Sequence, residues 1–228
     1  MKRGKKYQNI IKNRKEINSL IDALGNVKDL STSNFSSKIE CHIALNLGTK
    51  NNNQALKGSV TYKYKVGNDK KILVLTDKPI KGIKEDDNTI IGLNEYIDKI
   101  KDGWVDFDVL ITTPDIMPQI TLLGNILGPK SLMPNVKNGT ITNNLEETIN
   151  EYRKGKIDFK SDQTGVIHTI IGSTANSKEE LLDNLSTLIK GISAINSKPI
   201  NSMIKSMYIT PTMGPSIKID ASKISELL

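Results

Sequence analysis

The spacing of the apolar residues changes along the chain, and each change predicts a different kind of element. Over residues 7–30 the spacing is roughly helical, which predicts a helix in two pieces with Gly25 as a weak point. From Ile39 to Leu47 every second residue is apolar and most of the others are polar, so a strand with one buried face is expected. A second alternating strand is expected over residues 60–64.

Between residues 66 and 156 the pattern changes to alternating buried strands and helices. The segment Ile72–Leu75 is continuously apolar, which is typical of a strand covered on both faces. The elements expected after it are a helix around 96–100, a strand over 107–111, a helix starting at Pro114 and a strand ending at Ile141. Asn143 and Glu146 then form a capping pair for a helix that stops at Gly155. This alternation predicts a small three-layer α/β domain.

The last third of the chain returns to alternating strands, here around one amphipathic helix. Ser177 and Glu180 are a capping pair for this helix, which carries its apolar residues on one face. The strands are expected over residues 157–159, 166–171, 204–209 and 217–219. The last two flank the tetrapeptide Thr212-Met213-Gly214-Pro215, and no internal repeat is visible anywhere.

Composition favours a basic protein that meets polyanions. Thirty-two Lys and Arg residues against twenty-five Asp and Glu give a net charge of +7 and a pI near 9.3. Such a surplus attracts nucleic acids, because each neutralised phosphate releases condensed counterions. Cys41 is the only cysteine, which excludes an intramolecular disulfide and indicates a reducing compartment. No apolar run approaches the ~18–20 residues that span a bilayer, and the opening Met1–Lys6 indicates a basic arm rather than a secretory signal.

One segment suggests a nucleotide-binding enzyme, and one residue argues against it. The run from Gly124 to Ser131 matches a phosphate-binding P-loop at every fixed position except 129, where Pro129 stands in place of the glycine before the lysine. Proline has no backbone N–H to offer a phosphate, and its φ is locked. The segment also follows an expected helix rather than a strand, so nucleotide hydrolysis is disfavoured.

The two histidines offer little chemistry in the sequence. His42 and Cys41 are neighbours on one expected strand and therefore point to opposite faces, which excludes a nucleophile–base pair. His168 lies in another strand with no acidic residue close to it in sequence. No spacing typical of metal ligands is present. No catalytic residue, cofactor or metal is therefore expected.

The segment from Thr113 to Thr142 carries the most specific pattern in the chain. Its glycines and prolines indicate a rigid irregular loop, and Leu127, Leu132 and Met133 are expected to anchor that loop to a core. Its centre reads Leu-Gly-Asn-Ile-Leu-Gly-Pro-Lys-Ser-Leu-Met-Pro-Asn over residues 123–135. This run closely resembles the signature of the ribosomal protein L1 family of the large ribosomal subunit, in its bacterial or organellar form.

Other segments resemble the same family in order and spacing, so the resemblance covers nearly the whole chain. They are Gly4–Tyr7, Asp102–Trp104 with Asp106–Asp108, Thr164–His168, Lys198-Pro199 and Thr212–Ser216. The chain departs from the family where a Leu-Pro-His-Gly stretch usually crosses between domains, because Tyr62-Lys63-Tyr64-Lys65 stands there. Gln163 and Ser173 each stand where the family carries a lysine.

The resemblance implies an α/β (α+β) protein of two domains. Residues 1–65 and 157–228 are expected to form domain I, a split antiparallel sheet with helices that binds rRNA. Residues 66–156 are expected to form domain II, an inserted Rossmann-like three-layer α/β domain. The changes of pattern near Gly67 and Gly155 fall at the same places.

The resemblance also implies a function without catalysis. Members are structural constituents of the large subunit that bind the stalk region of its rRNA and assist release of deacylated tRNA from the exit site. Many also repress translation of their own mRNA. The implied partners are large-subunit rRNA, exit-site tRNA, other ribosomal components and its own mRNA, with no membrane. The implied location is a bacterial, mitochondrial or plastid ribosome, and the sequence leaves these three open.

The resemblance places the rRNA contacts on both sides of the insertion. The implied contacts are Phe35, Lys38, Glu40, Thr212, Met213 and Gly214. Thr212 can bond a 2′-hydroxyl, Gly214 lets the backbone approach a ribose, and Phe35 and Met213 offer apolar surfaces. Glu40 fits only as an acceptor for a base amine or a hydroxyl, and its alternative is a solvent-facing strand residue. The alternative for Phe35 is core packing.

The basic arm offers further candidates, which are Lys2, Arg3, Lys5 and Lys6. They are expected to contact phosphates, and a solvated tail is an equal alternative.

Two other classes of function stay open beside the ribosomal one. An enzyme built on the inserted domain would bind a nucleotide at residues 124–131, which Pro129 disfavours. A free RNA-binding regulator would not sediment with large subunits in high salt, whereas a ribosomal protein would.

Overall fold

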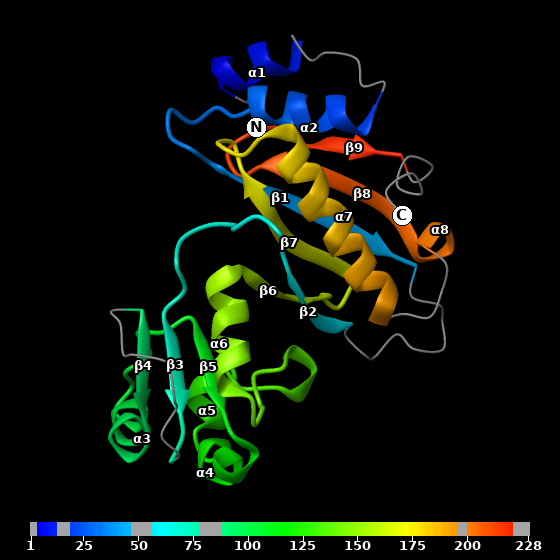
Figure 1. The fold of residues 1–228 in the computed structure, drawn as a ribbon. Coiled ribbons are helices and arrows are strands. Elements are labelled where there is room, and N and C mark those ends of the chain that lie inside the picture. Colours follow the sequence, from blue (N-terminus) through cyan, green and yellow to red (C-terminus); the bar gives the residue numbers. More distant parts are fainter. Residues whose placement is uncertain (1–3, 13–18, 47–55, 78–87, 196–199, 221–228) are drawn as a thin grey trace. The chain divides into compact units, whose positions relative to one another are not determined.

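The computed structural model describes residues 4–12, 19–46, 56–77, 88–195 and 200–220. The chain divides into two compact units (Figure 1). Unit 1 comprises Met1–Gly67 and Ile157–Leu228, and unit 2 is the continuous segment Asn68–Lys156. The structure is mixed α/β, with antiparallel pairing in unit 1 and a parallel sheet in unit 2, as the family resemblance implies. Among the described residues no helix is long and apolar enough to cross a membrane.

Unit 1 is built on a four-stranded antiparallel sheet with the order β7-β1-β8-β9. Its strands are β1 (Lys38–Leu45), β7 (Val166–Ser173), β8 (Ile204–Pro211) and β9 (Ile217–Ile219). β1 alternates as the sequence predicts, since Ile39, Cys41 and Ile43 are fully buried and the residues between them are not. The sheet therefore has one face in the core and one face open.

Two helices cover the buried face, α2 (Leu20–Asp29) and α7 (Lys178–Ile195), which cross it side by side (Figure 1). Leu24 and Leu185 are fully buried in the same core as the inward residues of β1. The other helices described in this unit are α1 (Lys5–Lys12) and the short α8 (Ile200–Met203). The helix expected over 7–30 thus forms two pieces, but Gly25 lies inside α2 and does not interrupt it.

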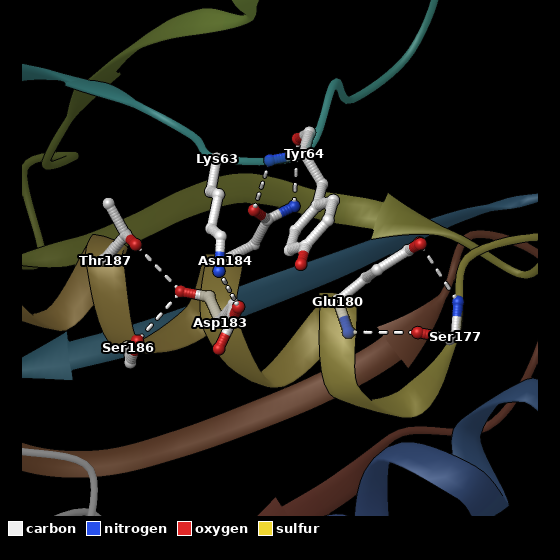
Figure 2. Close-up of polar contacts among 8 residues, drawn as sticks. All are labelled: Lys63, Tyr64, Ser177, Glu180, Asp183, Asn184, Ser186 and Thr187. Atoms are coloured by element: carbon white, nitrogen blue, oxygen red, sulfur yellow. Dashed lines mark hydrogen bonds and ion pairs between the residues drawn. The ribbon is translucent and has the colours of Figure 1, made fainter.

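The predicted capping pair of α7 is confirmed and is visible in Figure 2. The backbone N–H of Glu180 donates to Ser177 Oγ at 3.1 Å, and the N–H of Ser177 donates to the Glu180 carboxylate at 3.2 Å. This reciprocal arrangement satisfies two N–H groups that the first turn of a helix leaves without partners.

The segment that leaves unit 1 is tied to the middle of α7. The expected strand over 60–64 is instead β2 (Lys57–Thr61), which pairs with β6 (Lys156–Lys160). Beyond it, the fully buried Asn184 accepts a hydrogen bond from Tyr64 N at 3.2 Å and donates to Tyr64 O at 3.1 Å (Figure 2). Lys63 pairs with Asp183 at 2.9 Å, so the divergent crossing sequence has its own anchorage.

Unit 2 contains a three-stranded parallel sheet with the order β4-β3-β5. Its strands are β3 (Ile72–Leu75), β4 (Thr89–Gly92) and β5 (Val109–Thr112). Its helices are α3 (Asn94–Lys101), α4 (Met117–Thr121), α5 (Gly124–Leu127) and α6 (Leu145–Lys154), with 3-10 turns at Pro114–Ile116 and Val136–Asn138. Leu73 and Leu75 face a core with the first three helices, whereas Ile72 and Val74 face α6. The strand run is therefore covered on both faces, as its continuous apolar sequence predicts.

Unit 2 departs from the sequence analysis in one missed strand and two local predictions. The sequence pattern does not predict β4, because its short segment carries no distinctive alternation. The expected strand ending at Ile141 is a single parallel bridge to Thr112. The N-cap of α6 is Asn144 rather than Asn143, although the helix ends at Gly155, whose φ of 114° suits glycine, as predicted.

Candidate nucleic-acid interface

Two segments from distant parts of the chain meet at one edge of unit 1. They are the loop before β1, residues 30–37, and the turn between β8 and β9, residues 212–216. Thr32 donates from both its backbone N–H, at 2.9 Å, and its hydroxyl to the carbonyl of Met213. The N–H of Thr212 donates to Lys38 O at 3.0 Å. These bonds bring together the residues that the sequence places on both sides of the insertion.

The hydroxyl of Thr212 positions Glu40. It lies 2.7 Å from Glu40 Oε1, to which it donates, and 3.2 Å from Lys38 O. The carboxylate is held at the edge of the open sheet face, with its side chain 30% exposed. The hydroxyl expected to meet a ribose thus has an internal partner, while its lone pairs stay free to accept a further hydrogen bond.

Gly214 is required by the packing of its own turn. A Cβ at this position would lie 2.5 Å from the carbonyl oxygen of Leu30 and 2.6 Å from Pro211 Cγ. Since the first of these atoms is backbone, no side chain can be accommodated without moving the loop. From the sequence we expected that glycine is needed here so that a ribose can approach the backbone. The structure shows that glycine is also needed because the turn packs against Leu30 and Pro211.

Two large apolar side chains lie exposed on the joined segments. Phe35 is 69% exposed and Met213 is 54% exposed, while Lys38 is exposed at the start of β1. Exposure excludes core packing as the role of Phe35. Apolar surfaces beside a cation and a carboxylate are the chemistry with which proteins contact unstacked bases and riboses.

Part of the basic arm reaches the same loop. Lys6, on α1, donates from Nζ to Thr32 O at 3.1 Å and lies 3.5 Å from Asn34 Oδ1. Lys5 is exposed on the same helix. Lys2 and Arg3 lie outside the described residues.

A row of side chains on the open sheet face was missed by sequence reasoning. His42 pairs across the strands with His168 on one side and with Tyr208 on the other, and Tyr208 pairs with Lys218. The two Nδ1 atoms of the histidines lie 2.9 Å apart. The sequence pattern indicates that each of these residues faces outward on its strand. It does not indicate the strand pairing that aligns them in a row.

Acidic residues accompany both histidines, contrary to expectation for His168. Asp162 lies 3.7 Å from His168 Nε2, and Glu40 lies 3.6 Å from His42 Nε2. Hydrogen bonds from Val166 N and the Thr164 hydroxyl lower the pKa of Asp162. Burial, and then the neighbouring His168, lowers the pKa of His42, which Glu40 partly opposes.

Cys41 lies on the opposite face of β1 from His42, as the strand periodicity predicts. Its burial raises the pKa of the thiol to about 12. The thiol is therefore protonated at neutral pH and is not a nucleophile there.

Comparison with known proteins decides the family. The model of the ribosomal protein L1p/L10e family matches residues 27–215. The large ribosomal subunit protein uL1 of aster yellows witches'-broom phytoplasma is 39% identical over 230 residues, 99% of this chain and 100% of the relative. The uL1 proteins of Porphyromonas gingivalis and Bacteroides thetaiotaomicron are 39% and 37% identical over 213 and 211 residues, covering 91% and 92% of this chain and 90% and 91% of their own.

The chain belongs to the ribosomal protein L1p/L10e family. It is thus a ribosomal protein rather than an enzyme. The family match includes Phe35, Lys38, Glu40 and the turn 212–214, whereas the basic arm lies outside the matched residues.

The signature segment of the family forms an anchored loop in unit 2. Leu127 is fully buried at the end of α5, and Leu132 and Met133 pack against the same core. The segment follows α4 rather than a strand, and Ser131 adopts a left-handed φ of 58°. Pro129 lacks an N–H where a P-loop would donate one, so this loop is not built to cradle a phosphate.

Proposed function

We propose that the protein is a constituent of the large ribosomal subunit that binds the stalk region of its rRNA through unit 1. The contact surface comprises Phe35, Lys38, Glu40, Thr212, Met213 and Gly214, which we call the joined surface. The observation that carries the proposal is the hydrogen bonding between Thr32 and Met213, which joins the two segments and leaves Phe35 and Met213 exposed. Family membership supports the same assignment.

The chemistry of the joined surface suits recognition by shape more than by charge. Met213 and Phe35 can stack or wedge against bases, and Glu40 can accept from a 2′-hydroxyl or a base amine. Glu40 would repel a phosphate, so it must face a hydroxyl or an amine of the RNA. The hydrogen bond from Thr212 fixes the orientation of its carboxylate before RNA binds. Lys38 and Lys6 supply the positive charge that a neighbouring phosphate needs.

Unit 1 and unit 2 divide the work in this proposal. Domain I, residues 1–65 and 157–228, lies within unit 1 and binds rRNA, and the insertion 66–156 assists release of deacylated tRNA from the exit site. Repression of the protein's own mRNA belongs to the same proposal, because an mRNA that imitates the stalk rRNA would meet the joined surface. The organisms of the uL1 relatives named above are bacteria, which favours a bacterial ribosome as the location.

The binding surface can be tested with exposed apolar residues, whose truncation should leave the core intact. Phe35→Ala and Met213→Ala should each weaken binding to a stalk rRNA fragment, because base–side-chain stacking contributes roughly 1–3 kcal/mol. Leu122→Ala is the matched control, since Leu122 is 80% exposed but lies in unit 2. Wild-type affinity in both unit 1 variants, measured by filter binding, would show that the surface is assigned wrongly.

A second measurement separates the ribosomal role from that of a free RNA-binding regulator. The tagged chain should sediment with large subunits in high salt, and the Phe35→Ala/Met213→Ala double variant should be depleted from that fraction. A chain that binds the fragment but stays out of the subunit fraction would support the regulator instead.

A further inference from the structure

The two histidines of the chain face each other on the open sheet of unit 1. His42 on β1 and His168 on β7 are directly paired in the antiparallel register, although they are 126 positions apart. Their rings are inclined at 62° with centroids 5.0 Å apart, and their Nδ1 atoms are separated by 2.9 Å. The sequence contains no other histidine. The pair is therefore the whole imidazole content of the protein.

The carboxylates beside the two rings influence where the ring protons lie. Each Nε2 faces a carboxylate oxygen, Glu40 Oε2 at 3.6 Å from His42 and Asp162 Oδ2 at 3.7 Å from His168. These separations are within ion-pair range, and a carboxylate there favours the tautomer that carries its proton on Nε2. A neutral imidazole carries one proton only. With that tautomer on both rings, the two Nδ1 atoms present lone pairs to each other, and a cation between them satisfies both; a proton on one Nδ1 would instead make the contact a direct hydrogen bond.

We propose that His42 and His168 bind one divalent transition-metal ion through their Nδ1 atoms. The ions that suit imidazole are Zn²⁺, Ni²⁺ and Cu²⁺. Glu40 and Asp162 are positioning residues that orient the rings from the far side, as carboxylates do for metal-bound histidines. This site goes beyond the proposed rRNA function and does not depend on it.

The separation of the two nitrogens fits such an ion. An ion at the usual zinc–nitrogen distance of about 2.0–2.1 Å from atoms 2.9 Å apart makes an angle of roughly 90° between them. This is the angle of the tetragonal sites that Ni²⁺ and Cu²⁺ prefer. Tetrahedral Zn²⁺ needs the rings to separate by roughly 0.5 Å, which side chains on an open face can provide.

The remaining coordination positions are left to water. Among the described residues no group of three His, Cys, Asp or Glu side chains is placed to hold a metal ion. Cys41 is adjacent in sequence but lies on the buried face of the sheet. The site is therefore a two-ligand site at the surface, and we expect reversible binding rather than a structural role in folding.

The proposal can be tested by titrating ZnCl₂ or NiCl₂ into the full chain, purified without a histidine tag, in isothermal calorimetry. One ion should bind per chain, and His42→Gln and His168→Gln should each weaken binding at least tenfold. Asp183→Asn is the matched control, since it removes an exposed carboxylate of unit 1 that pairs with Lys63. Mg²⁺, which prefers oxygen ligands, should not compete. Thermal melting checks that each variant is folded.

Nitrogen NMR gives a second measurement. If the histidine pair has only a structural role, its ring-nitrogen signals should not move when Zn²⁺ is added. With two histidines in the chain, the ring nitrogens give four signals, and Zn²⁺ should shift the two Nδ1 signals most. Glu40→Gln should weaken Zn²⁺ binding about tenfold, as removal of such an outer carboxylate typically does. Absence of saturable binding, wild-type binding in both Gln variants, or ring signals unmoved by Zn²⁺ would overturn the proposal. None of these outcomes bears on the rRNA test with Phe35 and Met213.

Discussion

The sheets of the two units differ in how many of their faces are covered. The antiparallel sheet of unit 1 is covered by α2 and α7 on one face only, so every second residue of β1 is available to a partner. The parallel sheet of unit 2 is covered on both faces, and all four residues of β3 and of β5 are buried. Unit 2 can therefore offer a partner its helices, its loops and β4, whose last three residues are partly exposed, whereas unit 1 can offer an open sheet face. This difference agrees with the proposal that unit 1 carries the rRNA surface.

Removing unit 2 should change the function of the protein more than any other variant considered. It would separate rRNA binding, proposed for unit 1, from tRNA release, proposed for unit 2. β2 and β6 pair within unit 1 on both sides of the insertion, so residues 65 and 157 can be joined by a short Gly/Ser linker. The shortened chain should melt cooperatively, keep most of its affinity for stalk rRNA and no longer interact with tRNA on the ribosome. A folded product that fails to bind the rRNA fragment would place RNA contacts in unit 2.

Asn184→Ala should strongly destabilise unit 1 and leave unit 2 unchanged. The side-chain amide of Asn184 forms hydrogen bonds with the backbone of Tyr64 and with the carbonyl of Ile171. Its removal leaves these buried polar groups without partners. We expect a decrease of about 3 kcal/mol in the free energy of unfolding, measured with urea. Asp183→Ala removes only the exposed pair with Lys63 and should cost below about 1 kcal/mol. Equal decreases would mean that the crossing segment does not depend on Asn184.

Thr212→Val should weaken rRNA binding by roughly 1–3 kcal/mol, because the carboxylate of Glu40 is then without its hydroxyl partner. Gly214→Val should be worse, since its Cβ would meet the carbonyl of Leu30. Thr121→Val, in unit 2, is a control for removal of a hydroxyl. Both unit 1 variants binding a stalk fragment as tightly as the wild type would contradict the assignment.

The smallest effect is expected from the basic arm. Replacing Lys2, Arg3, Lys5 and Lys6 with Gln should flatten the dependence of log affinity on log salt, by up to ~0.9 for each phosphate that the arm no longer neutralises. Lys6 also holds Thr32, so a Lys6→Gln single variant separates its structural role from the charge of the arm. An unchanged slope would identify the arm as solvated.

Features fixed by neighbouring residues were predictable from the sequence. The buried face of β1, the strand Ile72–Leu75, the capping pair of α7 and the end of α6 at Gly155 all follow from local spacing. The signature in residues 123–135 identified the family, because a long irregular motif of glycines and prolines is specific.

What escaped prediction depends on contacts between distant residues. The pairing of His42 with His168 requires the register of β1 against β7, which no local pattern contains. The anchorage of Tyr64 by Asn184 joins residues 120 positions apart. The clash that reserves position 214 for glycine arises from the carbonyl of Leu30, which only the folded loop brings near.

The order of strands in unit 1 has a consequence for the timing of synthesis. β8 lies inside the sheet between β1 and β9, yet it is made after the whole of unit 2. Unit 2 is one continuous segment and can fold as soon as residue 156 has emerged from the translating ribosome. The bond from Thr32 to Met213 spans 181 positions, so the joined surface is completed only after Met213 has emerged. A nascent chain that has not reached Met213 therefore lacks the joined surface that we propose for rRNA binding.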